Sequence, residues 1–297
     1  MSSVPIAEPP HRERPMRRLS SFLHRHPYGR LVGLLAAPVG WLVVIYLGSL
    51  ALLLMAAFWD TETFTNDVVR NWNLDNFRQI LEQDVYRDVA LRTIAMAALV
   101  TLADAILAFP IAYYMARVAR PRTREILVVA ILTPLWASYL VKAFAWNAML
   151  LDDGFISWFL GPLGLGPPGD KVGLWLTFTY FWLPFMILPI YTGLERIPSS
   201  LLEASGDLGA RSLRTFWKVT LPLAFPAVVA GSIFTFSLTL GDFILPTLIA
   251  NQQFMGTVIY NDRSANLPVA AAFAMVPIVV MTVYLVLARR LGAFRAL

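Results

Sequence analysis

IPSSLLEASGDLGARSLRTFWKVTLP, residues 197–222, is the most polar stretch in the C-terminal half of this chain. It lies between two long apolar segments and is called the 197–222 loop below. Ser200 and Glu203 have the S-x-x-E spacing of a capping box, which predicts that a helix begins here. Gly209 stands about two and a half turns later, where a left-handed residue commonly ends a helix.

The second half of the loop has an amphipathic pattern of its own. Basic residues alternate there with apolar ones: Arg211, Arg214 and Lys218 with Phe216, Trp217 and Val219. Because proline lacks an amide hydrogen and disrupts a helix interior, Leu221-Pro222 is predicted to end this second piece.

The composition excludes several classes of protein. Of the 297 residues, 58% are hydrophobic and only 14% are charged, which is too apolar for a soluble domain and fits one membrane domain. There is no cysteine, so disulfides, cysteine metal sites and thiol catalysis are excluded. The three histidines, His11, His24 and His26, all precede the first apolar segment. We therefore expect no catalytic residue, no metal site and no cofactor.

Six apolar segments predict an all-α integral membrane fold with six transmembrane helices. They cover residues 31–59, 89–115, 126–149, 173–193, 223–249 and 268–288. The first is too long for a signal peptide and no clear cleavage site follows a short core, so we interpret it as an uncleaved helix. The predicted organisation is a basic tail at 1–30, a six-span domain at 31–289 that contains the 197–222 loop, and a short tail at 290–297.

Basic residues gather on one side of this predicted topology. They stand before the first span, at 117–124, at 196–218 and after the last span, whereas the opposite loops are richer in acids. Arg92 and Lys171 are among the few basic residues on that opposite side. The asymmetry predicts that both termini and the 197–222 loop are cytoplasmic, in a bacterial inner membrane. It also explains the basic tail without a nucleic-acid partner.

Glu203-Ala204-Ser205, Gly209, Val219 and Leu221-Pro222 are spaced as in the cytoplasmic coupling loop of binding-protein-dependent ABC importer permeases, which the loop resembles. That family's signature is Glu-Ala-Ala, three residues, Gly, nine residues, Ile, one residue, Leu-Pro. Ser205 and Val219 are the two departures. The resemblance implies that an ATPase contacts Leu201, Leu202, Glu203, Ala204, Ser205, Asp207, Leu208, Gly209 and Ala210. The alternative is an ordinary interfacial connector.

The resemblance also implies a set of partners in the lipid bilayer and on its two sides. They are a second homologous permease subunit, usually a different chain in the polyamine branch, two cytoplasmic P-loop ATPases and an extracytoplasmic solute-binding protein. The chain has no P-loop of its own, so we expect it to hydrolyse nothing. Closure of the ATPase dimer would move the 197–222 loop and switch the transport cavity between its two sides.

Three charged residues stand inside predicted spans, namely Asp104, Lys142 and Asp242. A charge at mid-helix depth costs about 2.5–3.5 kcal/mol on insertion scales, so each needs an explanation. The predicted depths of Asp104 and Lys142 differ by little more than the length of a lysine side chain. Two hypotheses stay open for Asp104: an ion pair with Lys142, or exposure to the transport cavity.

Asp242 lies in TLGDFILP, residues 239–246, which resembles the Gly-Asp-Phe…Pro run in the fifth core helix of spermidine/putrescine importer permeases. Gly241 and Pro246 predict a kinked helix there. An acid beside aromatic rings would suit an ammonium group. We therefore expect a cationic cargo and name Asp242, Phe243, Phe236 and Asp104 as substrate-pathway residues. Asp242 could instead cap a broken helix or contact the partner subunit.

Other functions remain possible at this stage. A permease of the same class could carry an opine, iron or an anion, and an unpaired Lys142 facing the cavity would favour an anionic or zwitterionic group. A secondary transporter would need internal inverted repeats, which this chain lacks. A membrane enzyme would need several catalytic groups at one depth, and three isolated charges do not supply them.

Overall fold

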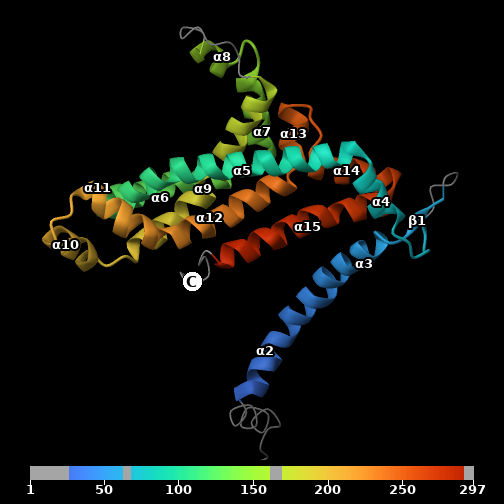
Figure 1. Ribbon diagram of the computed structural model, residues 1–297, viewed down its shortest axis with the longest axis horizontal. Coiled ribbons are helices and arrows are strands. Elements are labelled where there is room, and N and C mark those ends of the chain that lie inside the picture. The colour runs from blue at the N-terminus through green and yellow to red at the C-terminus, as the bar shows by residue number, and fades with distance from the viewer. Residues whose placement is uncertain (1–26, 63–67, 161–168, 291–297) are drawn as a thin grey trace, which may run out of the picture. The chain divides into compact units, whose positions relative to one another are not determined.

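The computed structural model describes residues 27–62, 68–160 and 169–290 (Figure 1). Most of the predicted N-terminal tail, at 1–26, and of the C-terminal tail, at 291–297, lies outside the described residues. The chain divides into two units, residues 1–55 and residues 56–297.

The first unit holds the first predicted span. It consists of α2 (Pro27–Trp41), the π-helical turn η1 (Leu42–Leu47) and α3 (Gly48–Ala56). Residues 34–56 are long and apolar enough to cross a membrane, as the sequence predicts. The π turn follows Pro38, whose missing amide hydrogen disturbs the regular helical hydrogen bonds.

The second unit holds the remaining membrane-length helices. They are α5 (Asp84–Tyr113), which continues into the π turn η2 (Tyr114–Val118), α9 (Asp170–Glu195), α12 (Leu221–Gly241) with the turns that precede it, and α15 (Leu267–Arg290). Shorter elements that the sequence did not predict lie between them. They are β1 (Asp60–Thr61), which pairs antiparallel with β2 (Val68–Val69), α4 (Asp75–Glu82), α8 (Phe155–Leu160) and α14 (Met255–Ala265).

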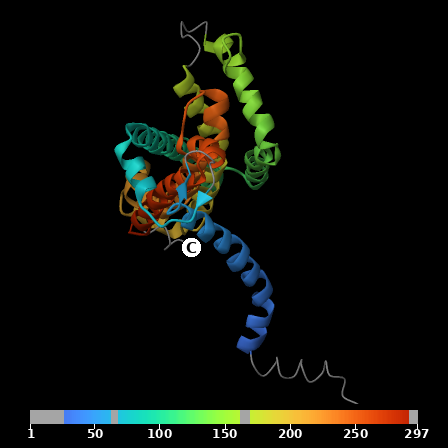
Figure 2. The ribbon, with the colours of Figure 1, turned by 90° about the vertical axis from the view of Figure 1, so that its right-hand side faces the viewer.

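The predicted third span is not one straight helix. It is α6 (Pro121–Trp136) followed by α7 (Tyr139–Leu150), with a bend of 93° between them. Pro134 lacks the amide hydrogen needed in the last turn of α6, and Ala137 and Ser138 are extended. Helix α7 runs toward α8 (Figure 2) and keeps contact with α13 and α9 of this unit. The described residues therefore hold five membrane-length helices, or six if α6 and α7 together make one span.

Helices α5, α9 and α12 lie side by side and form the centre of the second unit (Figure 1). Helix α15 packs along α12 and α14. The core is filled by large side chains of α9 against small ones of α5. Among them are Met186 and Ile190 on α9 and Ala108 and Ala112 on α5, all buried in one cluster. Small residues on one helix let another approach closely, which is how membrane helices gain packing contacts.

Two glycines mark the closest approach of α9 to α12. A Cβ atom added to Gly193 would lie 2.3 Å from the Cβ atom of Ala227. A Cβ atom added to Gly231 would lie 2.7 Å from the sulfur of Met186. Both distances are too short for real atoms, so these two helices can pack as they do only because glycine occupies both positions.

We predict that Gly193→Ala destabilises the protein, because overpacking a filled interface costs about 1–3 kcal/mol. The melting temperature in detergent should fall, and adding Ala227→Gly should restore it because the second change removes the clashing methyl group. Gly206→Ala is a matched control in α10 (Ser199–Asp207), where an added Cβ meets nothing within 4 Å. Equal melting temperatures for Gly193→Ala and the wild type would contradict the close packing.

Candidate functional site

A helix occupies the first part of the 197–222 loop, as predicted. It is α10, which spans Ser199–Asp207 and is preceded by Pro198 in an extended conformation. The predicted capping box is wrong, because no side chain caps this helix. Ser199 is already helical, so Ser200 is the second residue of the helix and its hydroxyl is not in the capping position.

The end of α10 has the predicted left-handed glycine, with φ of +77° at Gly209. The amide of Gly209 donates to the carbonyl oxygen of Gly206 at 2.8 Å, and the amide of Ala210 donates to that of Ser205 at 3.0 Å. These two bonds form a Schellman motif, which satisfies carbonyls that the helix itself leaves unpaired. Gly209 thereby sets the direction in which the chain leaves α10.

Helix α10 and its C-cap residue, Leu208, present apolar side chains to solvent. Leu208 is 89% exposed and Leu201 is 45% exposed. Of the other predicted ATPase-coupling residues, Glu203, Ala204, Asp207 and Gly209 are exposed, and Leu202, Ser205 and Ala210 are half-buried. The loop thus offers a mixed apolar and acidic surface of the kind that a protein partner can cover.

The second half of the loop continues directly into the next membrane helix. α11 (Ser212–Thr215), the π turn η4 (Phe216–Thr220) and α12 follow one another without a break, so the predicted end at Leu221-Pro222 is wrong. Pro222 sits in the first turn of α12, just after the wider π turn, where a proline ring is tolerated. The Phe216 ring packs edge-on against Phe109 and Tyr113 of α5.

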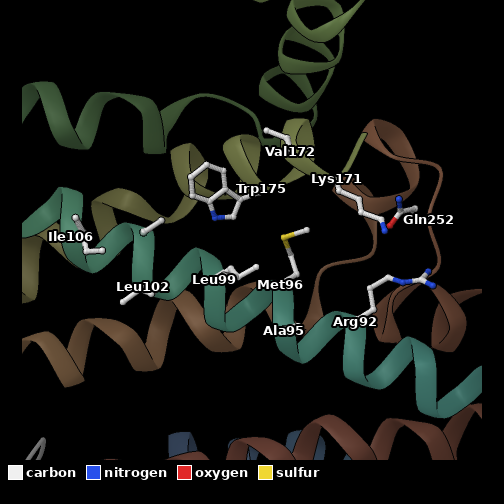
Figure 3. Close-up of a pocket in the computed structure, with 11 residues that line it drawn as sticks. Arg92, Ala95, Met96, Leu99, Leu102, Ile106, Lys171, Val172, Trp175 and Gln252 are labelled. Carbon is white, nitrogen blue, oxygen red and sulfur yellow. The ribbon is translucent and has the colours of Figure 1, made fainter. Parts of the chain in front are cut away.

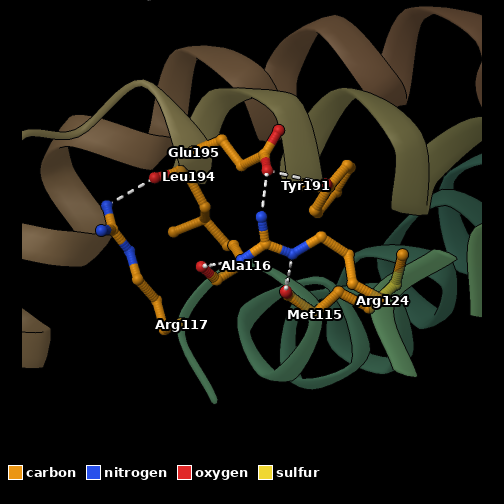
Figure 4. Close-up of polar contacts among 7 residues, drawn as sticks. All are labelled: Met115, Ala116, Arg117, Arg124, Tyr191, Leu194 and Glu195. Atoms are coloured by element: carbon orange, nitrogen blue, oxygen red, sulfur yellow. Dashed lines mark hydrogen bonds and ion pairs between the residues drawn. The ribbon is translucent and has the colours of Figure 1, made fainter. Parts of the chain in front are cut away.

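Two arginines of the basic run 117–124 hold the end of α9 where the loop begins (Figure 4). Arg117 donates to the carbonyl oxygens of Leu194 at 2.5 Å and Ile197 at 2.7 Å. Arg124 forms an ion pair with Glu195 at 2.9 Å. The sequence analysis used both arginines only as signs of topology. Their position two and nine residues beyond the predicted end of a span at residue 115 was the available signal, but nothing in the spacing names their partners.

The predicted kink at Asp242 is a break between two helices. α12 ends at Gly241 and α13 covers Ile244–Ile249. One carboxylate oxygen of Asp242 accepts the amides of Ile244 at 2.8 Å and Leu245 at 3.1 Å. The other accepts the hydroxyl of Tyr139 on α7. In this structure Asp242 therefore caps a broken helix, which is one of the alternatives that the sequence left open.

Aromatic rings surround a hollow of about 350 Å³ beside this break. Phe243 stacks on Tyr260 with ring centroids 4.4 Å apart, and the guanidinium of Arg263 lies 3.7 Å from the Tyr260 centroid. The hollow is lined by Leu140, Phe144, Phe243, Ile244, Thr247, Leu248, Tyr260 and Asn261. Phe236 is not part of it. That ring is buried and stacks on Tyr284 at 4.5 Å, and its role in the substrate pathway stays a prediction.

A second hollow of about 500 Å³ lies between α5 and α9 (Figure 3). Arg92, Lys171 and Gln252 stand at one end, and Ile106 stands at the other. The wall between them is apolar and includes Met96, Leu99, Leu102, Val172 and Trp175. Two cationic groups at the end of an apolar cleft favour an anionic group there. Among the described residues that line this hollow, none is acidic.

Comparison with known proteins accounts for the loop and the spans together. Residues 108–294 match the family described as "Binding-protein-dependent transport system inner membrane component". The chain is 46% identical over 299 residues to the inner membrane ABC transporter permease protein YdcU of Escherichia coli (strain K12), covering 94% of this chain and 95% of that protein. This chain belongs to that family of ABC importer permeases. It is accordingly a multi-pass inner-membrane subunit and not an enzyme.

Other relatives of this permease agree on the class and the fold. It is 30% identical over 233 residues to the spermidine/putrescine transport system permease protein PotB of Escherichia coli (strain K12), covering 74% of this chain and 82% of that protein. The fold is similar to a solved chain of a bacterial alginate ABC transporter in complex with an alginate pentasaccharide-bound periplasmic protein. The TM-score is 0.74 at 16% identity, over 94% of this chain and 98% of that chain.

The permease does not contain the proposed ion pair between Asp104 and Lys142. Asp104 is completely buried in α5, and neither of its carboxylate oxygens has a hydrogen-bond partner among the described residues. The ammonium of Lys142 instead lies 4.6 Å from the ring centroid of Phe181. Asp104 also lines neither of the two hollows, although its neighbour Ala103 lines the larger one. The similar depths that the sequence predicts for the two residues are therefore not sufficient to bring their charges together.

We expect the substitutions Asp104→Asn and Lys142→Met to act independently on stability. When two residues share no partners, the changes in unfolding free energy caused by substituting them add within about 0.5 kcal/mol. The changes caused by substituting two partners of a buried pair do not add. Thermal unfolding of the two single variants and the double variant in detergent measures the coupling. If the double variant loses clearly less stability than the two single variants lose together, the two charges do meet.

Proposed function

We propose that this permease imports a polyamine or a related organic cation as part of an ATP-driven complex. The similarity to the spermidine/putrescine permease PotB over 74% of the chain carries this proposal. Two cytoplasmic ATPases would supply the energy, and a second permease subunit would complete the membrane part. A solute-binding protein would deliver the cargo. The periplasmic protein bound in the similar alginate transporter supports that last partner.

Helix α10 is the proposed ATPase contact. Its exposed Leu201 and Leu208 would fill a groove on the ATPase, since an amphipathic helix commonly binds a partner through such apolar anchors. This places the 197–222 loop and both termini in the cytoplasm, which agrees with the basic residues gathered on that side. If the loop were only an ordinary connector, the 89% exposure of the Leu208 side chain would have no explanation.

The break at Asp242 is the proposed cargo contact. Asp242 does not itself line the aromatic hollow, but the next two residues in the chain, Phe243 and Ile244, do, together with Tyr260. A carboxylate and aromatic faces together offset the cost of removing water from an ammonium group. For a cation to bind here, the hydrogen bond from the Tyr139 hydroxyl to one carboxylate oxygen would break, which frees that oxygen for the cation. The other oxygen would still accept the two backbone amides and hold α13 in place. Asp242 would then serve both as a helix cap and as a charge for the cargo.

A second candidate is a cargo with an anionic group. The observation that favours it is the larger hollow, where Arg92 and Lys171 stand together at the end of an apolar wall. These are two of the basic residues that the predicted topology would put on the side opposite the 197–222 loop. A solute-binding protein on that side would release its cargo close to them. An anion or a zwitterion such as an opine would suit this hollow better than a polyamine would.

For the cationic cargo, we expect Asp242→Asn to lower putrescine uptake about tenfold or more, because charge-assisted bonds are worth about 1.5–3 kcal/mol and tenfold corresponds to about 1.4. The amide oxygen can still accept the amides of Ile244 and Leu245, so the helix cap survives. The measurement is uptake of labelled putrescine by cells that express the permease together with its partner subunits.

Two controls accompany this experiment. Asp242→Glu should keep part of the uptake because the charge is shifted and not lost, and Tyr139→Phe should keep it because the carboxylate remains. Wild-type uptake by Asp242→Asn would leave Asp242 as a cap only. Import of an anionic solute that is lost in Arg92→Gln, with no putrescine uptake in the wild type, would favour the second candidate.

We predict that Gly209→Ala weakens the ATPase contact without preventing membrane insertion. A residue with a Cβ atom in the left-handed region costs about 1–2 kcal/mol, and space is not the cause because an added Cβ meets nothing within 4 Å. The turn after α10 should loosen, so less ATPase should co-purify with the permease. Gly206→Ala, inside the same helix and equally open, should retain it. Unchanged co-purification in Gly209→Ala would contradict the ATPase contact at α10.

A further inference from the structure

Arg117 satisfies the backbone at the end of α9. The last carbonyls of a helix have no partner within the helix, and a cation there also interacts favourably with the helix dipole. Arg117 supplies two donors to this end, one to Leu194 in the helix and one to Ile197 just beyond it. Only Pro198 separates Ile197 from the start of α10. The end of the span that contains Arg117 is thus bonded to the residue from which α10 extends.

Arg124 joins the same end of α9 to two further helix ends (Figure 4). It lies in the first turn of α6, and its guanidinium donates to the carbonyl oxygens of Met115 at 3.0 Å and Ala116 at 3.4 Å in η2. A third donor reaches Glu195, the last residue of α9. Glu195 also accepts the hydroxyl of Tyr191 at 2.7 Å, which holds the carboxylate toward Arg124.

We propose that Arg117 and Arg124 form an arginine clamp that makes α10 move as one body with the adjoining ends of α5 and α6. The proposal rests on the ATPase contact at α10. When the ATPases displace α10, the force reaches the permease through Ile197 and the end of α9. The clamp passes this displacement to two more spans, so both arginines are positioning residues for coupling and not ligands of the cargo.

The construction of α9 explains why such a clamp is needed. Pro184 and Pro189 stand inside this helix and remove two of its backbone hydrogen bonds. A helix weakened in this way bends at the prolines, so pushing on its end alone would tilt the last turns and leave the rest in place. Bonds from η2 and α6 to the segment beyond Pro189 hold that end against neighbouring helices, which lie on the same side of the weak points.

The basic run supplies its own comparison. Arg117 and Arg124 are half-buried, whereas Arg120 and Arg122 in the same run are exposed. All four contribute alike to the charge that orients a membrane protein, but in the described part of the chain only Arg117 and Arg124 connect helix ends through hydrogen bonds. Arginine suits this role because its planar guanidinium presents several donors in a fixed geometry, which a lysine ammonium does not.

The clamp can be tested by measuring distances in the assembled complex. The chain has no cysteine, so a spin-label pair can be placed at Ser200→Cys in α10 and Val129→Cys in α6, both exposed positions. The complex is measured without nucleotide and after trapping with ATP and vanadate. With the clamp intact, we expect the same narrow distance distribution in both states. With Arg117→Gln or Arg124→Gln, we expect the distribution to broaden or shift on trapping.

Uptake and ATP hydrolysis give a second readout. The Gln variants should keep their ATPase subunits and hydrolyse ATP while uptake falls about tenfold, and Arg122→Gln should resemble the wild type in every measurement. Arg117→Lys and Arg124→Lys keep the charge with fewer directed donors, and they serve in place of any Gln variant that does not accumulate in the membrane.

Three results would overturn the clamp. One is a wild-type distance that already changes on trapping, and another is a variant distribution equal to that of the wild type. The third is a loss of melting temperature with unchanged distances, which would make both arginines structural only. If α10 does not contact the ATPase, substitutions in α10 will leave the amount of co-purified ATPase unchanged. This result is distinguishable from the three that overturn the clamp.

Discussion

A helix end within or near a bilayer needs hydrogen-bond partners from the protein, because hydrocarbon offers none to its unpaired amides and carbonyls. The second unit of this permease meets that requirement with specific side chains. Asp242 accepts the amides at the start of α13, and Arg117 donates to the carbonyls at the end of α9. The turn at Gly209 satisfies the end of α10 with backbone groups alone. Each of these places is also one where the family resemblance expects the permease to move or to contact another molecule.

Two acids in apolar segments show how the same signal in a sequence can have different outcomes. Asp104 and Asp242 are both single carboxyl groups in apolar segments. Asp242 lies at a helix break, so free amides are available and α7 brings the Tyr139 hydroxyl to it. Asp104 lies in the middle of the unbroken α5, where all nearby amides are already used by the helix, and it remains without a partner among the described residues. The state of the backbone decides which acid is satisfied.

The basic run 117–124 likewise has two physical roles, charge that sets topology and directed hydrogen bonds, which the sequence alone does not distinguish. Charge counting treats its four arginines as equal, and this is sufficient to predict topology. Packing separates them, because η2 and α6 direct Arg117 and Arg124 toward the end of α9 and leave Arg120 and Arg122 at the surface. The exposed pair provides charge only, whereas the inward pair also provides directed hydrogen bonds.

The sequence by itself determined the membrane class, the positions of the long helices and the left-handed Gly209, because these depend on local composition and on spacing within one segment. The tertiary structure alone decided the 93° bend between α6 and α7 and the unbroken helix through Pro222. It also decided the cap at Asp242, the separation of Asp104 from Lys142 and the partners of Arg117. The reason is that such contacts join residues far apart in the chain. Their distances depend on how helices pack and bend, which no periodicity within a single helix records.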